Sequence, residues 1–231
     1  MRSGSLRTSD ETGYRPGAGA YEGGPLREVT GIAIRPGGLT LTDRAIDLCR
    51  FVAGARLLDV GCGAGATVEH LCRQYAFAAR GVDCSSKLIA EGRGRNPSLL
   101  LTEAAAESLP YIAESLDGIL CECVLSLLDE PLTALREFHR VLRGGGCLIL
   151  SDMYDRGKSA GSPRGTVTRG EIEVWLSESG FTTMVWEDHT PLLTELAARL
   201  ILSHGTLEGL CCTASGAGTR PGYYLLLAHK E

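Results

Sequence analysis

The chain has 231 residues, 44% of them hydrophobic, and its formal net charge is -5. This length suffices for one sizeable hydrophobic core, and the acidic balance provides no basic field for a nucleic-acid backbone. No apolar run approaches the roughly 18 residues that a membrane-spanning helix requires, and residues 1–10 lack the apolar segment of a signal peptide. We therefore expect a cytoplasmic protein with a small-molecule partner, no nucleic-acid partner and no insertion into a membrane; the oligomeric state is not predicted.

Nine cysteines occur in the sequence, an odd number, and none are spaced as the C-x-x-C pairs that are typical of zinc sites. In a cytoplasmic chain this pattern argues against a disulfide framework. We expect no bound metal, and most of the thiols should be small buried side chains.

Along the chain, residues 1–28 come first; they are polar and rich in Gly, Ser and Arg, and this composition predicts a flexible tail. The remainder, 29–231, is predicted to form a single domain. Apolar residues recur at helical spacing between Leu41 and Val52 and predict a helix. Next, a strand, a helix and a second strand are predicted at 56–60, 66–76 and 79–83. This order makes a right-handed parallel unit.

The alternation of helices and strands continues through the middle of the chain. Further helices are predicted at 85–95 and 130–146, and further strands at 98–104, 116–122 and 147–153. Five strands that alternate with helices predict an α/β, Rossmann-like, doubly wound parallel sheet. In the last part of the chain, helices are predicted at 169–180 and 191–207, and strands at 181–190 and 222–230.

A glycine-rich string, "LLDVGCGAGA", follows the first strand. Gly61, Gly63 and Gly65 let the backbone turn sharply and approach a ligand closely. The string also satisfies the dinucleotide fingerprint, with Asp83 about 20 residues further on, so the glycines alone do not separate NAD from other nucleosides. Asp59 favours a cofactor with an amino group and no phosphate, because a carboxylate repels a pyrophosphate. S-adenosylmethionine meets this condition, and an NAD-dependent oxidoreductase is the rival interpretation.

Several linked strings carry a family resemblance: "LLDVGCGAG", "GVDCS", "AESLPY" and the run that ends in "LRGGGCLILSD". Over about residues 39–152 the chain resembles the class I S-adenosylmethionine-dependent methyltransferases, in particular the group that includes the ubiquinone and menaquinone biosynthesis enzymes. The resemblance implies a seven-stranded sheet with an antiparallel last strand, S-adenosylmethionine as the cofactor, and methyl transfer to a small molecule by in-line displacement. It also implies a cofactor-binding core at about 39–152 and a substrate-side part at 153–231.

The resemblance assigns the cofactor site residue by residue. Asp59 and the glycines line the methionine part, and Asp83 accepts hydrogen bonds from both ribose hydroxyls. Relatives commonly carry an Asp in the loop after the third strand that accepts from the adenine amino group, but this chain has Ala105 there. The backbone N–H of Ala106 remains available, and Glu103 and Glu107 are the two nearby acids that could replace the Asp, although each also fits the role of a surface acid. The expected cofactor-binding residues are Asp59, Gly61, Cys62, Gly63, Gly65, Asp83, Cys84, Ala106, Glu107 and Glu122.

The methyl acceptor is expected next to the ends of the fourth and fifth strands, because ligands of doubly wound sheets bind at the carboxyl ends of the strands. No catalytic residue is predicted outright, since transfer from an activated carbon mainly requires alignment. Cys123 is the candidate contact to the acceptor. Strand alternation puts Cys121 and Cys123 on one face and Glu122 on the other if the strand continues that far. The resemblance instead implies that the chain turns into a loop near Glu122, which would leave Cys121 in the strand core and Cys123 at the crevice.

Two further hypotheses stay open. Arsenite methyltransferases, which share the fold, typically carry a metalloid-binding Cys in an N-C-V string, and "ECV" here is similar; Cys123 with Cys211 or Cys212 would then hold arsenite or another soft acceptor. Alternatively, the chain is a degenerate, non-catalytic partner with the methyltransferase fold, for which Ala105 is the supporting feature. The identity and the atom type of the acceptor are not determined by the sequence.

Overall fold

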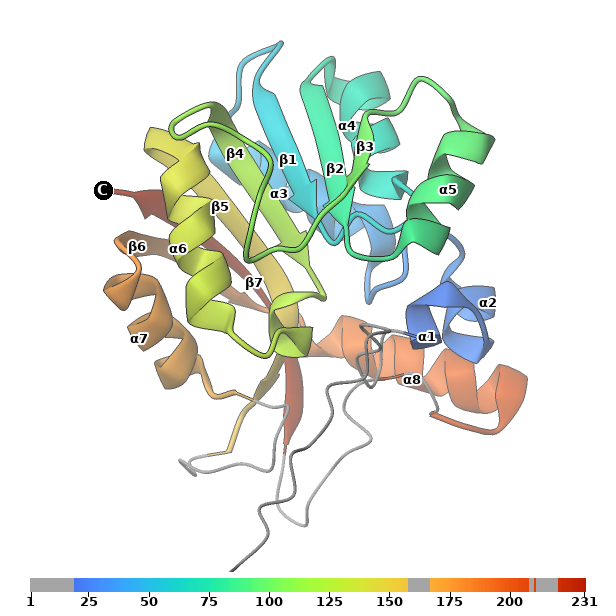
Figure 1. Ribbon diagram of the computed structural model, residues 1–231. Coiled ribbons are helices and arrows are strands. Elements are labelled where there is room, and N and C mark those ends of the chain that lie inside the picture. Colours follow the sequence, from blue (N-terminus) through green and yellow to red (C-terminus); the bar gives the residue numbers. More distant parts are fainter. Residues whose placement is uncertain (1–18, 158–166, 208–209, 211–219) are drawn as a thin grey trace, which may run out of the picture.

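The computed structural model describes residues 19–157, 167–207, 210 and 220–231. Within these residues seven strands form one sheet in the order β3-β2-β1-β4-β5-β7-β6 (Figure 1). Strands β1 to β5 pair in parallel, whereas β7 lies antiparallel between β5 and β6. The predicted α/β, Rossmann-like sheet with an antiparallel last strand is confirmed. The strands are β1 (Arg56–Val60), β2 (Ala78–Asp83), β3 (Leu101–Glu103), β4 (Leu116–Glu122), β5 (Leu142–Asp155), β6 (Phe181–Asp188) and β7 (Pro221–Lys230).

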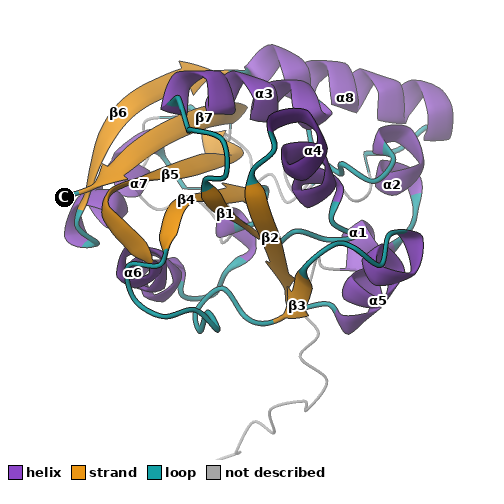
Figure 2. Cartoon of the chain, turned by 90° about the horizontal axis from the view of Figure 1, so that it is seen from above, coloured by secondary structure: helices purple, strands orange, loops and turns teal. Residues whose placement is uncertain are grey.

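Helices cover both faces of the sheet (Figure 2). Residues of α3, α4 and α8 pack in one buried apolar cluster, and residues of α6 and α7 pack in a second cluster on the opposite face. The helices are α1 (Gly19–Glu22), α2 (Pro25–Thr30), α3 (Gly38–Cys49), α4 (Ala66–Tyr75), α5 (Ser86–Arg95), α6 (Pro131–Val141), α7 (Arg169–Glu178) and α8 (Thr190–His204), with a short 3-10 turn at Leu125–Leu127. None of the helices in the described residues is long and apolar enough to cross a membrane.

Two expectations about element boundaries differ from the structure. The flexible tail was expected to reach residue 28, but residues 19–30 contain α1 and α2, and Leu26 of α2 is buried in the same apolar cluster as the inner face of α8. Because Leu26 packs against residues of α8, which are far away in the sequence, the local sequence around Leu26 does not indicate that it is buried. Residues 1–18 of the expected tail lie outside the described residues. In addition, the helix expected at 130–146 ends at Val141, and its terminal glycines lie in β5.

Local sequence explains several of the elements. The interior of β4 is buried almost throughout, as expected for a parallel strand covered on both faces. Helix α6 begins with Pro131, whose fixed φ suits the first helical position. Helix α7 begins with a capping box in which Thr168 and Glu171 satisfy each other's backbone N–H groups. Because β1, β2 and β4 pair in parallel, their carboxyl ends lie at the same edge of the sheet.

Candidate active site

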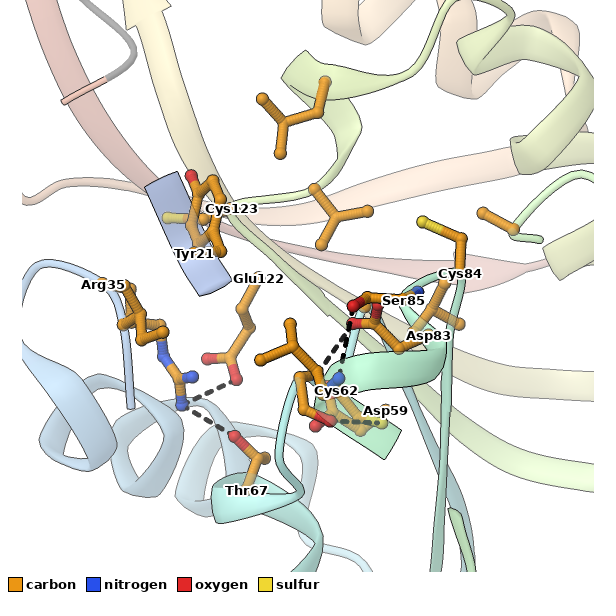
Figure 3. Close-up of a pocket in the computed structure, with 18 of the residues that line it drawn as sticks. Tyr21, Arg35, Asp59, Cys62, Thr67, Asp83, Cys84, Ser85, Glu122 and Cys123 are labelled. Atoms are coloured by element: carbon orange, nitrogen blue, oxygen red, sulfur yellow. Dashed lines mark hydrogen bonds and ion pairs between the residues drawn. The ribbon is translucent and has the colours of Figure 1, made fainter. Parts of the chain in front are cut away.

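A pocket lies at the carboxyl ends of β1, β2 and β4 (Figure 3). The turn after β1, the residues after β2 and β4, the loop after β3, helix α1 and the segment before α3 all contribute to its wall. Most of the residues singled out from the sequence line this one pocket, namely Asp59, Gly61, Cys62, Gly63, Asp83, Cys84, Ala106, Glu107, Glu122 and Cys123. Ala105, which stands where relatives carry an Asp, is also part of the lining.

The glycine-rich turn is tight for a steric reason. Gly61 has φ +75, and a Cβ placed on it would lie 2.1 Å from Cγ2 of Val124. Gly65 also has a positive φ, +79, but it precedes the first residue of α4 and does not line the pocket. It is the one expected cofactor residue outside the lining, because it faces the apolar core instead: a Cβ placed on it would lie 3.0 Å from the Leu101 side chain.

Asp83 organises one side of the pocket. Its carboxylate accepts hydrogen bonds from the backbone N–H of Gly63, at 2.8 Å, and from that of Ser85, also at 2.8 Å. Burial raises the pKa of Asp83, and these two N–H donors act in the opposite direction. Each carboxylate oxygen accepts one of these bonds, which leaves each oxygen with further acceptor capacity towards the pocket.

Asp59 is buried, with 4% of its surface exposed. Burial raises its pKa to about 8, the negative charge of Glu122 adds to the shift, and the positive charge of Arg35 opposes it. The Asp59 carboxyl of the free protein is therefore mostly protonated at neutral pH and half protonated near pH 8. A cationic group beside it would favour the ionised form.

A buried ion pair closes the pocket on the side of α3. The Arg35 guanidinium lies 2.9 Å from the Glu122 carboxylate, and the same nitrogen donates to Thr42 at 2.6 Å and to Thr67 at 3.0 Å. Burial is the largest single effect and works to lower the pKa of Arg35, but Glu122 and the other acidic groups around it together outweigh burial, and the pKa is raised. In Figure 3, Arg35 and Glu122 point towards each other, apart from the side that carries Asp83 and Ser85.

Strand β4 ends at Glu122, where the resemblance implies a turn into a loop, so the alternation does not continue through "CEC". Cys123 has φ +58, a left-handed conformation that non-glycine residues rarely adopt, and its backbone N–H donates to the carbonyl of Ser151 at 2.7 Å. As a result Cys121 and Cys123 do not share a face: Cys121 is buried in the cluster under α6, and Cys123 belongs to the cluster under α3 and lines the pocket.

The chain after Cys123 is fixed by a buried acid. The Asp152 carboxylate accepts from the backbone N–H of Ser126 at 2.9 Å and from its hydroxyl at 2.8 Å. Burial raises the pKa of Asp152, and the N–H donors oppose that shift. This anchor holds the 3-10 turn in place, and Leu127 and Leu128 consequently form part of the pocket wall.

With this geometry established, comparison with known proteins identifies the family. A family model described as a methyltransferase domain matches residues 58–150. Trans-aconitate 2-methyltransferase from Methylobacterium nodulans is 31% identical over 192 residues, which cover 73% of this chain and 70% of the relative. The chain belongs to the S-adenosylmethionine-dependent methyltransferases. This assignment confirms the expected family.

Solved structures agree with this fold. The (4+2)-cyclase SpnF matches the methyltransferase with a TM-score of 0.71 and 25% identity, over 87% of this chain and 83% of the cyclase. A phosphoethanolamine N-methyltransferase 2 from Haemonchus contortus, in complex with S-adenosyl-L-methionine, matches with a TM-score of 0.73 and 19% identity. The match covers 96% of this chain and 58% of the Haemonchus chain. The chain spans about half or less of the first curated relatives it matches, 51%, 45% and 34% of their lengths.

Sequence reasoning did not identify the residues that α1 and the segment before α3 contribute to the pocket of this methyltransferase. Tyr21 and Glu22 of α1, and Ile32, Ile34 and Arg35 before α3, all line it. The residues before Leu39 lie outside the linked strings, and an isolated Arg in a loop carries no signal of its own. Cys211 and Cys212, which were considered as thiolate donors, lie outside the described residues.

Proposed function

We propose that this methyltransferase binds S-adenosylmethionine in the pocket at the ends of β1, β2 and β4 and transfers its methyl group to a small-molecule acceptor by in-line displacement. The observation that carries the proposal is the presence of two carboxylates, Asp59 and Asp83, in one pocket around a tight glycine turn. An acidic pocket of this kind suits a cationic cofactor without phosphate and disfavours the pyrophosphate of NAD.

The residues present fit each part of this cofactor. Asp83, already oriented by two backbone N–H groups, has acceptor capacity for the ribose hydroxyls. Asp59 supplies a carboxylate for the amino group, and Arg35 supplies positive charge for the carboxylate of the methionine part. When bound, the cofactor supplies a methyl group activated by the neighbouring sulfonium. The remaining proposed cofactor contacts are Gly61, Cys62, Gly63, Cys84, Ala106, Glu107 and Glu122.

Isothermal titration calorimetry tests this proposal most directly. S-adenosylmethionine and S-adenosylhomocysteine should bind, and NAD should not. Preferential binding of NAD would indicate an oxidoreductase instead. Absence of binding by all three would favour a non-catalytic partner with this fold, the hypothesis that Ala105 supports. Binding without methyl transfer would point to another reaction on the same fold, of which the cyclase SpnF is an example.

The charges around the pocket bear on the acceptor. The described lining contains five acidic side chains, Glu22, Asp59, Asp83, Glu107 and Glu122, and one basic side chain, Arg35, which is paired with Glu122. Because Arg35 is already engaged by Glu122 and by the proposed methionine carboxylate, the described lining leaves no positive charge to neutralise an anionic acceptor. We therefore propose an acceptor without an anionic group, in contrast to trans-aconitate, the compound named for the relative from Methylobacterium nodulans.

A matched pair of fluorescent probes tests the charge of the acceptor. N-phenyl-1-naphthylamine and 8-anilinonaphthalene-1-sulfonate share an aromatic body and differ by one sulfonate. With the protein saturated by S-adenosylhomocysteine, the uncharged probe should bind at least about tenfold more tightly. Equal or tighter binding of the sulfonate, or methylation of trans-aconitate, would overturn this part of the proposal.

The soft-acceptor alternative has a clear test of its own. The described residues contain no group of three or more His, Cys, Asp or Glu side chains that could hold a metal ion. Methylation of arsenite that is lost in Cys123→Ser would nevertheless establish that alternative, and absence of turnover with arsenite would remove it.

A further inference from the structure

A second unusual feature of the pocket lies behind Cys123. The side chain of Tyr223, from β7, is fully buried, and its hydroxyl oxygen lies 3.2 Å from Sγ of Cys123 and 3.3 Å from Oγ of Ser151. Tyr223 itself does not line the pocket, whereas Cys123 does. The thiol is thus the end of a buried polar chain that starts at Ser151 and opens into the pocket.

Two observations indicate that a ligand contacts this end of the pocket. Cys123 holds a left-handed backbone conformation, and such strain persists where the surroundings enforce it. Independently, Arg35, which is more than nine-tenths buried and lines the same wall, has a buried Nε without a hydrogen-bond partner. A buried donor without a partner in the free protein is typical of a site that a bound polar atom completes.

The position of Cys123 separates it from the ribose side of the pocket. In Figure 3, Cys123 lies on the side of Glu122 and Arg35, away from Cys84, Ser85 and Asp83. With the ribose at Asp83 and the methionine part between Asp59 and Arg35, the thiol lies past the methionine end of the cofactor, where the methyl group has to meet the acceptor. We propose that Tyr223 is a positioning residue that holds the Cys123 thiol at the acceptor part of the pocket; this assignment rests on the proposed function.

The direction of the hydrogen bond follows from the chemistry of the two groups. The Tyr223 hydroxyl has a single proton, which it donates to Oγ of Ser151 while the Cys123 thiol is neutral and can itself donate. An ionised Cys123 can only accept, so the Tyr223 hydroxyl then donates to Sγ of Cys123. This bond orients the sulfur and stabilises its ionised form. A Tyr223 that only filled space would have no such effect, because Phe has the same ring and fills the same space.

Alkylation kinetics test the proposal without a known acceptor. The full chain and its Tyr223→Phe variant are treated with iodoacetamide, with and without S-adenosylhomocysteine, and modification of each cysteine is followed by peptide mass spectrometry. Cys84, which lines the pocket, and Cys72, which is exposed outside it, serve as internal references. Tyr224→Phe is the matched control, because Tyr224 is equally buried but packs against Trp186 in the other apolar cluster.

In Tyr223→Phe we expect Cys123 to be alkylated about three- to tenfold more slowly than in the wild type, the effect of one lost hydrogen bond, with Cys72 unchanged. Tyr224→Phe should leave the rate at Cys123 unchanged. An unchanged or faster rate in Tyr223→Phe overturns the positioning role. If that variant does not fold, as judged by circular dichroism, Ser151→Ala should raise the rate at Cys123 by a smaller factor, because the Tyr223 proton is then no longer shared with Ser151. An unchanged or slower rate in Ser151→Ala overturns the role.

The arm with S-adenosylhomocysteine tests the acceptor assignment. The bound product should protect Cys84 and leave Cys123 reactive within about threefold of its rate in the free protein. Protection of Cys123 as strong as that of Cys84 places the thiol on the cofactor and overturns the assignment. If titration detects no S-adenosylhomocysteine binding, the proposed function and the acceptor assignment both fail, while the comparison of Tyr223→Phe with the wild type still decides the positioning role.

Discussion

The two sides of the pocket are constructed differently. On the Asp83 side, the hydrogen bonds run from backbone N–H groups to a carboxylate and join residues 20 and 2 positions apart. On the Arg35 side, side chains bind side chains across 80 residues between Thr42 and Glu122, and across 100 residues between Cys123 and Tyr223. The first side depends on a short string of sequence, and the second depends on the assembled fold.

The largest expected effect of a substitution is on the Arg35 side. Arg35→Ala leaves the Glu122 carboxylate, which is 2% exposed, without its charged partner. Breaking a buried pair in this way costs about 3 to 5 kcal/mol of folding stability. Urea unfolding should show this loss, and the double variant Arg35→Met with Glu122→Gln should recover part of it, because no buried charge is then left unpaired. A loss below about 1 kcal/mol in the single variant would mean that the ion pair of Arg35 and Glu122 contributes no more to folding stability than an exposed pair does.

The next effect concerns binding on the Asp83 side. Asp83→Ala removes the acceptor of the Gly63 and Ser85 N–H groups together with the proposed ribose contacts. S-adenosylhomocysteine should bind about a hundredfold more weakly, since hydrogen bonds to a charged group are worth about 1.5 to 3 kcal/mol each. Asp117→Ala, which removes an acid that pairs with Arg56 and Arg143 at the start of β4, should leave the affinity unchanged in the same titration. Equal losses in the two variants would contradict a specific role for Asp83.

The same contrast explains what the sequence could predict. The hydrophobic runs of the strands, the glycine-rich turn, Asp59 and Asp83 all occur in contiguous strings of sequence. Of the cofactor residues predicted from these strings, all except Gly65 line the pocket. The side chains from α1 and from the segment before α3 could not be predicted, because Leu26 finds its apolar partners only when α8 is in place. Tyr223 could not be recognised either, since in the sequence it is one tyrosine in an apolar strand. The positive φ of Cys123 likewise depends on β5, through the bond to Ser151.

The acidic centre between the two sides predicts a dependence on pH. The free Asp59 carboxyl has a pKa of about 8, and the cofactor amino group would lower it in the complex. Binding below pH 8 therefore requires loss of a proton, so affinity for S-adenosylhomocysteine should fall about tenfold per pH unit as the pH decreases from 8. Titrations between about pH 6 and pH 8 measure this slope. In Asp59→Asn, which cannot ionise, the slope should vanish; an unchanged slope would assign the proton to another group.

The smallest expected effect tests how far backbone contacts alone sustain the Asp83 side. The Ser85 hydroxyl caps α5 by accepting from the Leu88 N–H at 3.2 Å, and it donates to Glu22 of α1 at 2.7 Å. Ser85→Ala should lower the free energy of unfolding by about 1 kcal/mol through loss of the cap. The Ser85 N–H still donates to Asp83, so affinity for S-adenosylhomocysteine should fall by less than about threefold. A loss above about tenfold, absent from the exposed control Ser98→Ala, would mean that the contact between Ser85 and Glu22 also determines binding, and that this side too depends on a distant helix.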